Sequence, residues 1–138
     1  VNNVTAYFGN GGKLYSPRVV NDPDQDPEIL AENLTSQETY EIVRQGLNMA
    51  VEPGGTGYPF FDFDEIYGVR VAGKTGTAEF GARDNQETHA WFTVFGPYGN
   101  EEAEIALTVF LENGGGGSDD AAPIARELFD YWFKDRKK

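Results

Sequence analysis

The residues best suited to chemistry lie together in the stretch from Gly68 to Thr77, which reads GVRVAGKTGT. Lys74 can place a positive charge beside a carboxylate, and the Thr75 hydroxyl can donate a hydrogen bond to the same group. Gly73 and Gly76 bracket these residues, and glycine inside a strand marks a site of close approach. The free N–H and C=O groups of an edge strand can also pair with an extended peptide. The pattern therefore predicts a strand that binds a peptide with a carboxylate.

Two other interpretations of this stretch stay open. Gly68, Gly73, Lys74 and Thr75 fit the G-x-x-x-x-G-K-T pattern of a nucleotide-binding phosphate loop, which requires a helix to begin at Lys74 and Thr75. The residues that follow, GTAEFGARDN, do not favour a helix, and the β-branched alternation before Gly73 is typical of a strand. The other possibility is a surface strand whose lysine and threonines bind nothing.

Composition restricts the partners of the chain. Its 138 residues include 11 basic and 23 acidic side chains, a net charge of −12, and no cysteine. Such a chain is repelled by nucleic acid and by anionic membranes, so we expect neither as a partner. The absence of cysteine excludes disulfides, thiolate nucleophiles and cysteine-ligated metals, and we expect no metal and no cofactor. No apolar run reaches the roughly 18 residues that cross a bilayer, so we expect no membrane contact by this chain itself.

Helices are predicted in three places. Val1 to Phe8 reads as the end of a helix that Asn10-Gly11-Gly12 stops. A capping box formed by Thr35 and Glu38 predicts a second helix, which Pro53-Gly54-Gly55 ends. Its predicted buried stripe comprises Tyr40, Val43, Leu47, Ala50 and Val51. Asp120 is the predicted N-cap of a final helix, which places Pro123 in its first turn. Its buried face is expected to comprise Ala121, Ala125, Leu128, Phe129 and Trp132.

Lys13 to Val20 is predicted to be an extended edge segment, since Pro17 cannot donate to a ladder. Strand character also appears in residues 67–80, 89–95 and 104–111. Turn-forming residues at 97–102 join the last two segments, which predicts a hairpin. The sequences AWFTVF and IALTVFL are apolar on both faces, so both faces of the sheet must be covered. The predicted fold class is therefore α+β, with an antiparallel sheet packed between helices.

Other polar residues carry no predicted chemistry. The acidic loop from Asp22 to Pro27 begins like a calcium loop but has proline where that loop needs glycine. His89 is the sole histidine and has no nucleophile or ligand cluster near it in the sequence. Asp62, Asp64 and Glu65 are expected to be solvated.

Several separated segments, taken in order, resemble the C-terminal part of the transpeptidase domain of class B penicillin-binding proteins. They are FGNGGKLYSPRVV, GGTG, VAGKTGTAEF, HAWFTVFGPYG, EIALTVFLENGG and AAPIARELFDYW. This resemblance implies the β-lactamase-like fold of that family, with an antiparallel sheet between helices. It also implies an enzyme that acylates a serine on the terminal D-Ala-D-Ala of a peptidoglycan stem peptide, and that β-lactams imitate this substrate.

The resemblance assigns roles to the central stretch. Lys74 is expected to hold the positive potential of the catalytic site, and Thr75 to bind the carboxylate of the substrate or antibiotic. Gly76 leaves room for the substrate, and the backbone N–H of Thr77 is an expected oxyanion-hole donor. Lys74 and Thr77 are thus the predicted catalytic residues, and Lys74 to Thr77 together form the predicted substrate-binding strand.

The other catalytic motifs of the family are missing from the chain. None of its serines, Ser16, Ser36 and Ser118, is followed by lysine three positions later. Ser118-Asp119-Asp120 differs from the family's Ser-x-Asn motif and is more typical of a helix start. We therefore expect residues 1–138 to form one incomplete domain, inactive alone, whose partner is the upstream part of the transpeptidase domain.

The resemblance places the parent protein outside the cytoplasm, anchored in the membrane by a helix that this chain lacks. A non-catalytic module that binds peptidoglycan peptides or β-lactams is the main alternative. The phosphate-loop protein is the remote alternative.

Overall fold

The computed structural model describes residues 1–20, 22–81, 87–99 and 102–136. Its centre is a three-stranded sheet in the order β3 (Ala72–Phe80), β4 (Glu87–Gly96) and β5 (Ile105–Leu111), and both neighbouring pairs are antiparallel. A small separate sheet pairs β1 (Lys13–Tyr15) with β2 (Ile29–Glu32). The predicted α+β class and the hairpin of β4 and β5 are confirmed.

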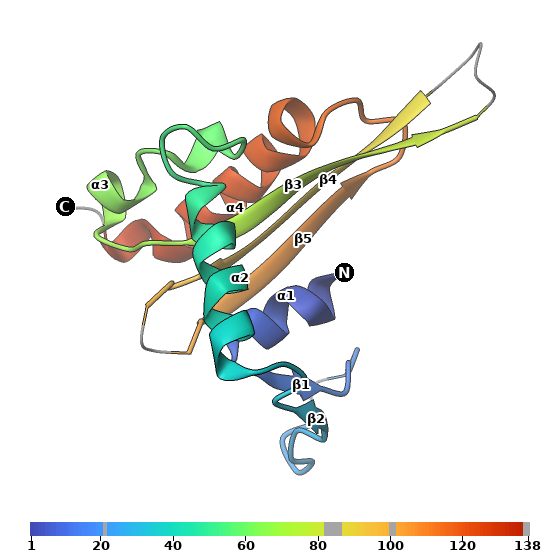
Figure 1. Ribbon diagram of the computed structural model, residues 1–138, viewed down its shortest axis with the longest axis vertical. Helices are drawn as coiled ribbons and strands as arrows, with labels where there is room; N and C mark the ends of the chain where they lie inside the picture. The colour runs from blue at the N-terminus through green and yellow to red at the C-terminus, as the bar shows by residue number, and fades with distance from the viewer. Residues whose placement is uncertain (21, 82–86, 100–101, 137–138) are drawn as a thin grey trace.

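Helices cover both faces of the central sheet (Figure 1). α4 (Ala122–Phe133) packs on one face, where β4 contributes Ala90, Phe92 and Val94 to the core. α1 (Asn2–Gly9) lies on the other face, because the Thr5 hydroxyl is 2.6 Å from that of Thr93, whose side chain points away from that core. α2 (Gln37–Met49) crosses the sheet near the beginning of β3. In the described ranges no helix is long and apolar enough to span a bilayer.

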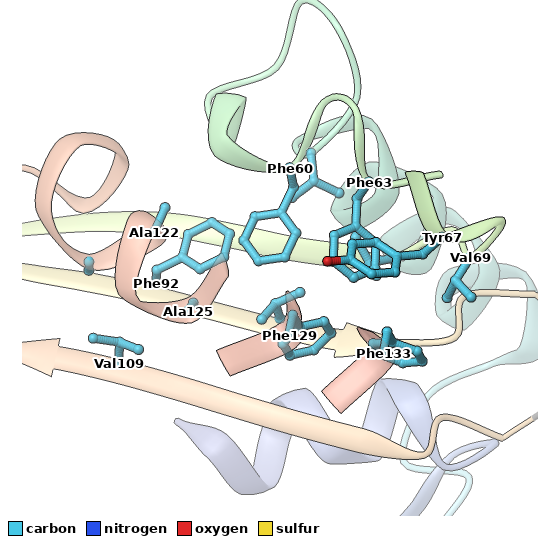
Figure 2. Close-up of a cluster of buried hydrophobic side chains, with 14 of the residues drawn as sticks. Phe60, Phe63, Tyr67, Val69, Phe92, Val109, Ala122, Ala125, Phe129 and Phe133 are labelled. Carbon is cyan, nitrogen blue, oxygen red and sulfur yellow. The ribbon is translucent and has the colours of Figure 1, made fainter. Parts of the chain in front are cut away.

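An aromatic cluster fills the space between the sheet and α4 (Figure 2). It joins Phe92 of β4, Phe129 and Phe133 of α4, and two residues from the connection between α2 and β3, Phe60 and Phe63. Phe60 lies in the 3-10 helix η1 (Tyr58–Phe60) and Phe63 begins α3 (Phe63–Tyr67). The rings of Phe60 and Phe92 stack with centroids 5.3 Å apart. Burying these rings supplies the main apolar stabilisation of this side of the sheet.

Arg126 of α4 holds the same connection in place through charge. Its Nη1 donates to Asp62 at 2.5 Å and also to the Pro59 carbonyl, and its Nε donates to Asp130 at 2.7 Å. Burial alone would lower the pKa of Arg126, but the hydrogen bonds to the two carboxylates raise it overall. Asp62 is exposed, as expected for a solvated carboxylate, and it also pairs with the largely buried guanidinium of Arg126.

Three predicted boundaries are corrected by the structure. The strand predicted from Tyr67 begins at Ala72, because residues 63–67 form α3, which ends at Gly68 with φ of 68°. The N-cap of α2 is Ser36 rather than Thr35, since the Ser36 hydroxyl accepts from the Thr39 N–H at 3.2 Å. The extended segment predicted for Lys13 to Val20 is a strand only as far as Tyr15.

The beginning of α4 also differs from the prediction. Asp120 is not its N-cap, because a turn of π-helix, η2 (Gly117–Ala121), precedes α4, and the Asp120 carboxylate accepts from the Gly116 N–H at 2.8 Å. Pro123 lies in the first turn of α4, as predicted. Residues 100 and 101 of the predicted turn lie outside the described residues.

The buried face of α4 is only partly as predicted. Ala121, Ala125 and Phe129 are buried, but the other inward positions are Ala122 and Phe133. Leu128 and Trp132 are 47% and 52% exposed, so the prediction that they are buried is wrong. The predicted stripe on α2 is half correct, since Tyr40 and Val51 are buried and Val43, Leu47 and Ala50 are only partly covered. Arg44 and Asn48 are buried on α2, and the Asn48 side chain donates to the Val71 carbonyl at 2.7 Å.

Replacing neighbouring residues of α4 tests this face directly. We expect Phe129→Ala to lower the free energy of unfolding by about 3–5 kcal/mol, because it opens a cavity beside Phe60, Phe63 and Phe133, whose rings contact this fully buried ring. Leu128→Ala is the matched control and should cost less than about 1 kcal/mol. Urea unfolding followed by tryptophan fluorescence measures both, and equal losses would contradict the described face.

Candidate functional site

The Lys-Thr-Gly-Thr stretch lies in β3, at the edge of the central sheet. Its partner on one side is β4, and no described strand pairs with its other side. Gly73 to Ala78 are all extended, so the helix that a phosphate loop requires at Thr75 is absent and that alternative is wrong. The position at an edge leaves backbone donors and acceptors of β3 open to an extended ligand.

Lys74 is exposed on the face of the sheet that also carries α1. It pairs with Thr93 across the β3–β4 ladder, and side chains at paired positions share a face. Its Nζ donates to the Thr75 carbonyl at 2.6 Å. Within the described part of the chain no carboxylate forms an ion pair with Lys74, so its charge is available to an anionic ligand.

Thr75 points to the opposite face and meets the loop that follows α2. Its hydroxyl lies 2.7 Å from that of Thr56, in the Gly54-Gly55-Thr56-Gly57 segment. Either hydroxyl can donate, which leaves the other free to donate to a further acceptor. The Thr75 side chain is half-buried and therefore reachable by a ligand at the edge of β3.

Gly76 takes part in two close approaches. A Cβ at this position would lie 3.2 Å from the Trp91 side chain on β4. On the other face, a Cβ on Gly117 of η2 would lie 2.6 Å from the Gly76 carbonyl and 2.8 Å from the Gly76 nitrogen. A side chain on Gly117 would therefore force the strand to move, whereas a Cβ on Gly76 would require the Trp91 side chain to shift by a few tenths of an ångström.

Thr77 is exposed, and its hydroxyl accepts a long hydrogen bond of 3.4 Å from the Gly117 N–H. This contact brings the segment between β5 and α4 against the end of the motif. Two residues further on, Asp119 accepts a hydrogen bond of 2.9 Å from the Tyr58 hydroxyl. All four predicted residues, Lys74 to Thr77, thus lie on one strand. Two loops contact this strand on the face opposite Lys74.

Two hollows lie on the α1 face beside Lys74. The first, of about 300 Å³, is lined in part by Lys74, Gly76 and Trp91. The second, of about 400 Å³, continues between α1 and α2 and is lined mainly by apolar residues: Val1, Val4, Thr5, Phe8, Val43, Leu47, Gly73, Thr93 and Phe95. An apolar hollow that adjoins an unpaired lysine can receive another segment of protein as well as part of a ligand.

The remaining polar residues that the sequence singled out stay apart from this strand's chemistry. His89 accepts from the Asn113 N–H at 3.2 Å and stacks on Phe80, which is a structural arrangement. No described hydrogen bond joins the hydroxyl of Ser16, Ser36 or Ser118 to a basic side chain. The described residues hold no group of three or more potential metal ligands.

Sequence reasoning missed the supporting residues Thr56, Tyr58, Gly117 and Asp119. Thr56 and Gly117 contact residues of β3 that lie 19 and 40 positions away in the sequence. Tyr58 and Asp119 contact each other across 61 positions. The available signal was the density of glycine around Thr56 and Gly117, since such segments allow backbone to approach closely.

Comparisons with known proteins agree with this geometry. The family model described as the penicillin binding protein transpeptidase domain matches residues 2–130. The chain is 35% identical to the peptidoglycan D,D-transpeptidase MrdA of Haemophilus influenzae over 153 aligned positions, which cover 96% of this chain and 23% of that protein. It is 40% identical to MrdA of Salmonella typhimurium over 105 positions, or 67% of this chain and 16% of that protein. The chain therefore spans less than a quarter of these curated relatives.

Solved structures show the same fold. Penicillin-binding protein 2B of Streptococcus pneumoniae superposes with a TM-score of 0.68 at 26% identity, covering 94% of this chain and 23% of that one. A complex between a penicillin-binding protein (PBP2) and MreC from Helicobacter pylori gives a TM-score of 0.71 at 24% identity, with 96% and 23% covered. The partial β-lactamase-like fold expected from the resemblance is confirmed, and this chain belongs to the penicillin-binding protein transpeptidase family.

Proposed function

We propose that this chain forms one wall of the active site of a D-Ala-D-Ala transpeptidase that cross-links peptidoglycan. The observation that carries the proposal is Lys74-Thr75-Gly76-Thr77 on the open edge of β3, with no described carboxylate paired to Lys74. The substrate is the terminal D-Ala-D-Ala of a stem peptide, and β-lactams compete because they imitate it. The family match and the relatives named D,D-transpeptidases support this activity.

Each residue of the strand has a proposed role. Lys74 holds positive potential where the substrate presents its carboxylate, and the Thr75 hydroxyl donates to that carboxylate. Gly76 lets the substrate backbone lie against the strand. The Thr77 backbone N–H donates to the oxyanion that forms when the nucleophile attacks, and one such donor is worth roughly 3 kcal/mol of the barrier. Lys74 and Thr77 are thus proposed as catalytic, and Thr77 acts through its main chain.

The nucleophile is proposed to lie in the upstream part of the transpeptidase domain, on a Ser-x-x-Lys motif that this chain does not contain. Residues 1–138 are then one incomplete segment, and the hollow lined by Val4, Phe8 and Leu47 is the surface that receives the rest of the domain. The parent protein works at the outer side of the cytoplasmic membrane, where peptidoglycan is built, and is held there by an anchor outside this chain.

A non-catalytic module that binds stem peptides or β-lactams is the second candidate. Its support is the same strand, because binding needs Lys74 and Thr75 but no nucleophile. A Ser-x-x-Lys upstream in the parent protein distinguishes the two functions.

Removing the charge of Lys74 tests its role. In the longer protein that carries this segment, we expect Lys74→Ala to lower the second-order rate of acylation by a fluorescent penicillin about 10- to 100-fold. A hydrogen bond to a charged group contributes about 1.5–3 kcal/mol, which corresponds to this loss. Lys134→Ala, a change of an exposed lysine directly after the C-terminal end of α4, is the control and should leave the rate unchanged. A normal rate in Lys74→Ala would contradict the proposal.

The location of the nucleophile is tested with this chain by itself. We expect no covalent labelling of residues 1–138 by a fluorescent penicillin, because the chain lacks the acylated serine. Co-expression with the upstream segment should restore labelling, with the label on the upstream segment after denaturing electrophoresis. Covalent label on residues 1–138 would show that the nucleophile lies in this chain, which would contradict the proposal.

A further inference from the structure

Two loops meet behind the Lys-Thr-Gly-Thr strand, on the face opposite Lys74. We call them the first clasp loop, residues 54–58, and the second clasp loop, residues 114–119. The first follows α2 and the second joins β5 to α4. Although about 60 residues separate them in sequence, the Tyr58 hydroxyl of the first donates to the Asp119 carboxylate of the second at 2.9 Å.

The first clasp loop is packed tightly at its base and contacts β3 at its tip. The Gly57 N–H donates to the Ala50 carbonyl at 2.7 Å, and a Cβ on Gly57 would lie 2.8 Å from the Val51 side chain. Thr56 then reaches the Thr75 hydroxyl at 2.7 Å. Because the base of the loop has no free space, the position of Tyr58 and that of Thr56 are coupled.

The second clasp loop rests directly on the strand backbone. Gly117 leaves no room for a Cβ against the Gly76 carbonyl and the Trp91 carbonyl, at 2.6 and 2.5 Å. Thr88 fixes the beginning of the loop, since its hydroxyl donates to the Gly115 carbonyl at 2.9 Å. Asp119 is two residues beyond Gly117, and Tyr58 is two residues beyond Thr56. The Tyr58–Asp119 hydrogen bond therefore links the contact of Gly117 with the strand to the contact of Thr56 with Thr75.

We propose that Tyr58 and Asp119 are positioning residues, whose hydrogen bond holds the two clasp loops together so that Thr75 and the Thr77 N–H face the substrate in a fixed geometry. The inference rests on the proposed function of β3. Neither residue needs to touch the substrate. A small displacement of the groups that bind the substrate lowers the reaction rate. A hydrogen bond at the surface that prevents such a displacement therefore affects the rate.

The surroundings of the pair indicate a local rather than a global role. Tyr58 is 50% exposed and Asp119 is exposed, so the bond lies at the surface and not in the aromatic core. The hydrogen bond to Asp119 raises the pKa of Tyr58, so the phenol keeps the proton that the bond requires. Arg126 independently holds the neighbouring Pro59 carbonyl, so loss of the Tyr58 bond leaves the connection to α3 attached to α4.

The experiment measures acylation by a fluorescent penicillin in the longer protein that carries this segment. We expect Tyr58→Phe and Asp119→Ala each to lower the second-order acylation rate about 3- to 10-fold, with an unchanged melting temperature. The double variant should lose no more than either single variant, because both remove one bond. Asp119→Asn should restore most of the rate, because its amide oxygen still accepts from Tyr58. Tyr131→Phe, at an exposed tyrosine of α4, is the matched control and should have no effect.

The outcomes separate this inference from the function on which it rests. An unchanged rate in Tyr58→Phe, or additive losses in the double variant, would overturn the inference alone. An Asp119→Asn loss equal to that of Asp119→Ala would do the same, because it would assign the effect to charge. Absence of labelling in the unmodified protein would overturn the proposed function, and the inference with it.

Discussion

The geometry of the site depends on one close backbone contact, in which Gly117 lies against Gly76 and the Trp91 carbonyl with no space for a side chain. This contact fixes β3 from behind, while the ladder to β4 fixes it along one edge. No strand in the described part of the chain pairs with the other edge. Alternation along the strand then directs Lys74 to the face of α1 and Thr75 to the face of the clasp loops, so one short motif presents a cation on one face and a hydroxyl on the other.

The aromatic core and the Arg126 network keep that contact in place. Phe129 and Phe133 fix α4 against Phe60 and Phe63, and α4 in turn carries the turn of π-helix that begins with Gly117. Arg126 adds a charged link from α4 to Asp62, at the other end of the same connection. Burial of aromatic side chains thus holds the elements beneath the site together, and hydrogen bonds between the loops fix the residues at its surface. The open hollows lie on the opposite, α1 face.

The sequence predicted what depends on local pattern and missed what depends on distant contacts. Strand alternation and the family resemblance together predicted β3 and the grouping of Lys74 with Thr77. Tyr67 was wrongly placed in that strand, because only the left-handed Gly68 separates α3 from it. Helical spacing on α4 predicted Leu128 and Trp132 on the inward face, but the core lies against Ala122 and Phe133, and spacing alone does not show where a neighbouring element packs. The Thr56–Thr75 and Tyr58–Asp119 bonds join separate loops, and periodicity carries no signal for such pairs.

The central claim is that the edge of β3 binds the acyl group of the substrate or antibiotic. A crystal structure of the longer protein acylated with a penicillin tests it most directly. We expect the antibiotic carboxylate to accept a hydrogen bond from Thr75 with Lys74 beside it, and the acyl oxygen to accept one from the Thr77 N–H, at about 2.7–3.1 Å. An acylated antibiotic that makes no contact with Lys74, Thr75 or Thr77 would contradict it.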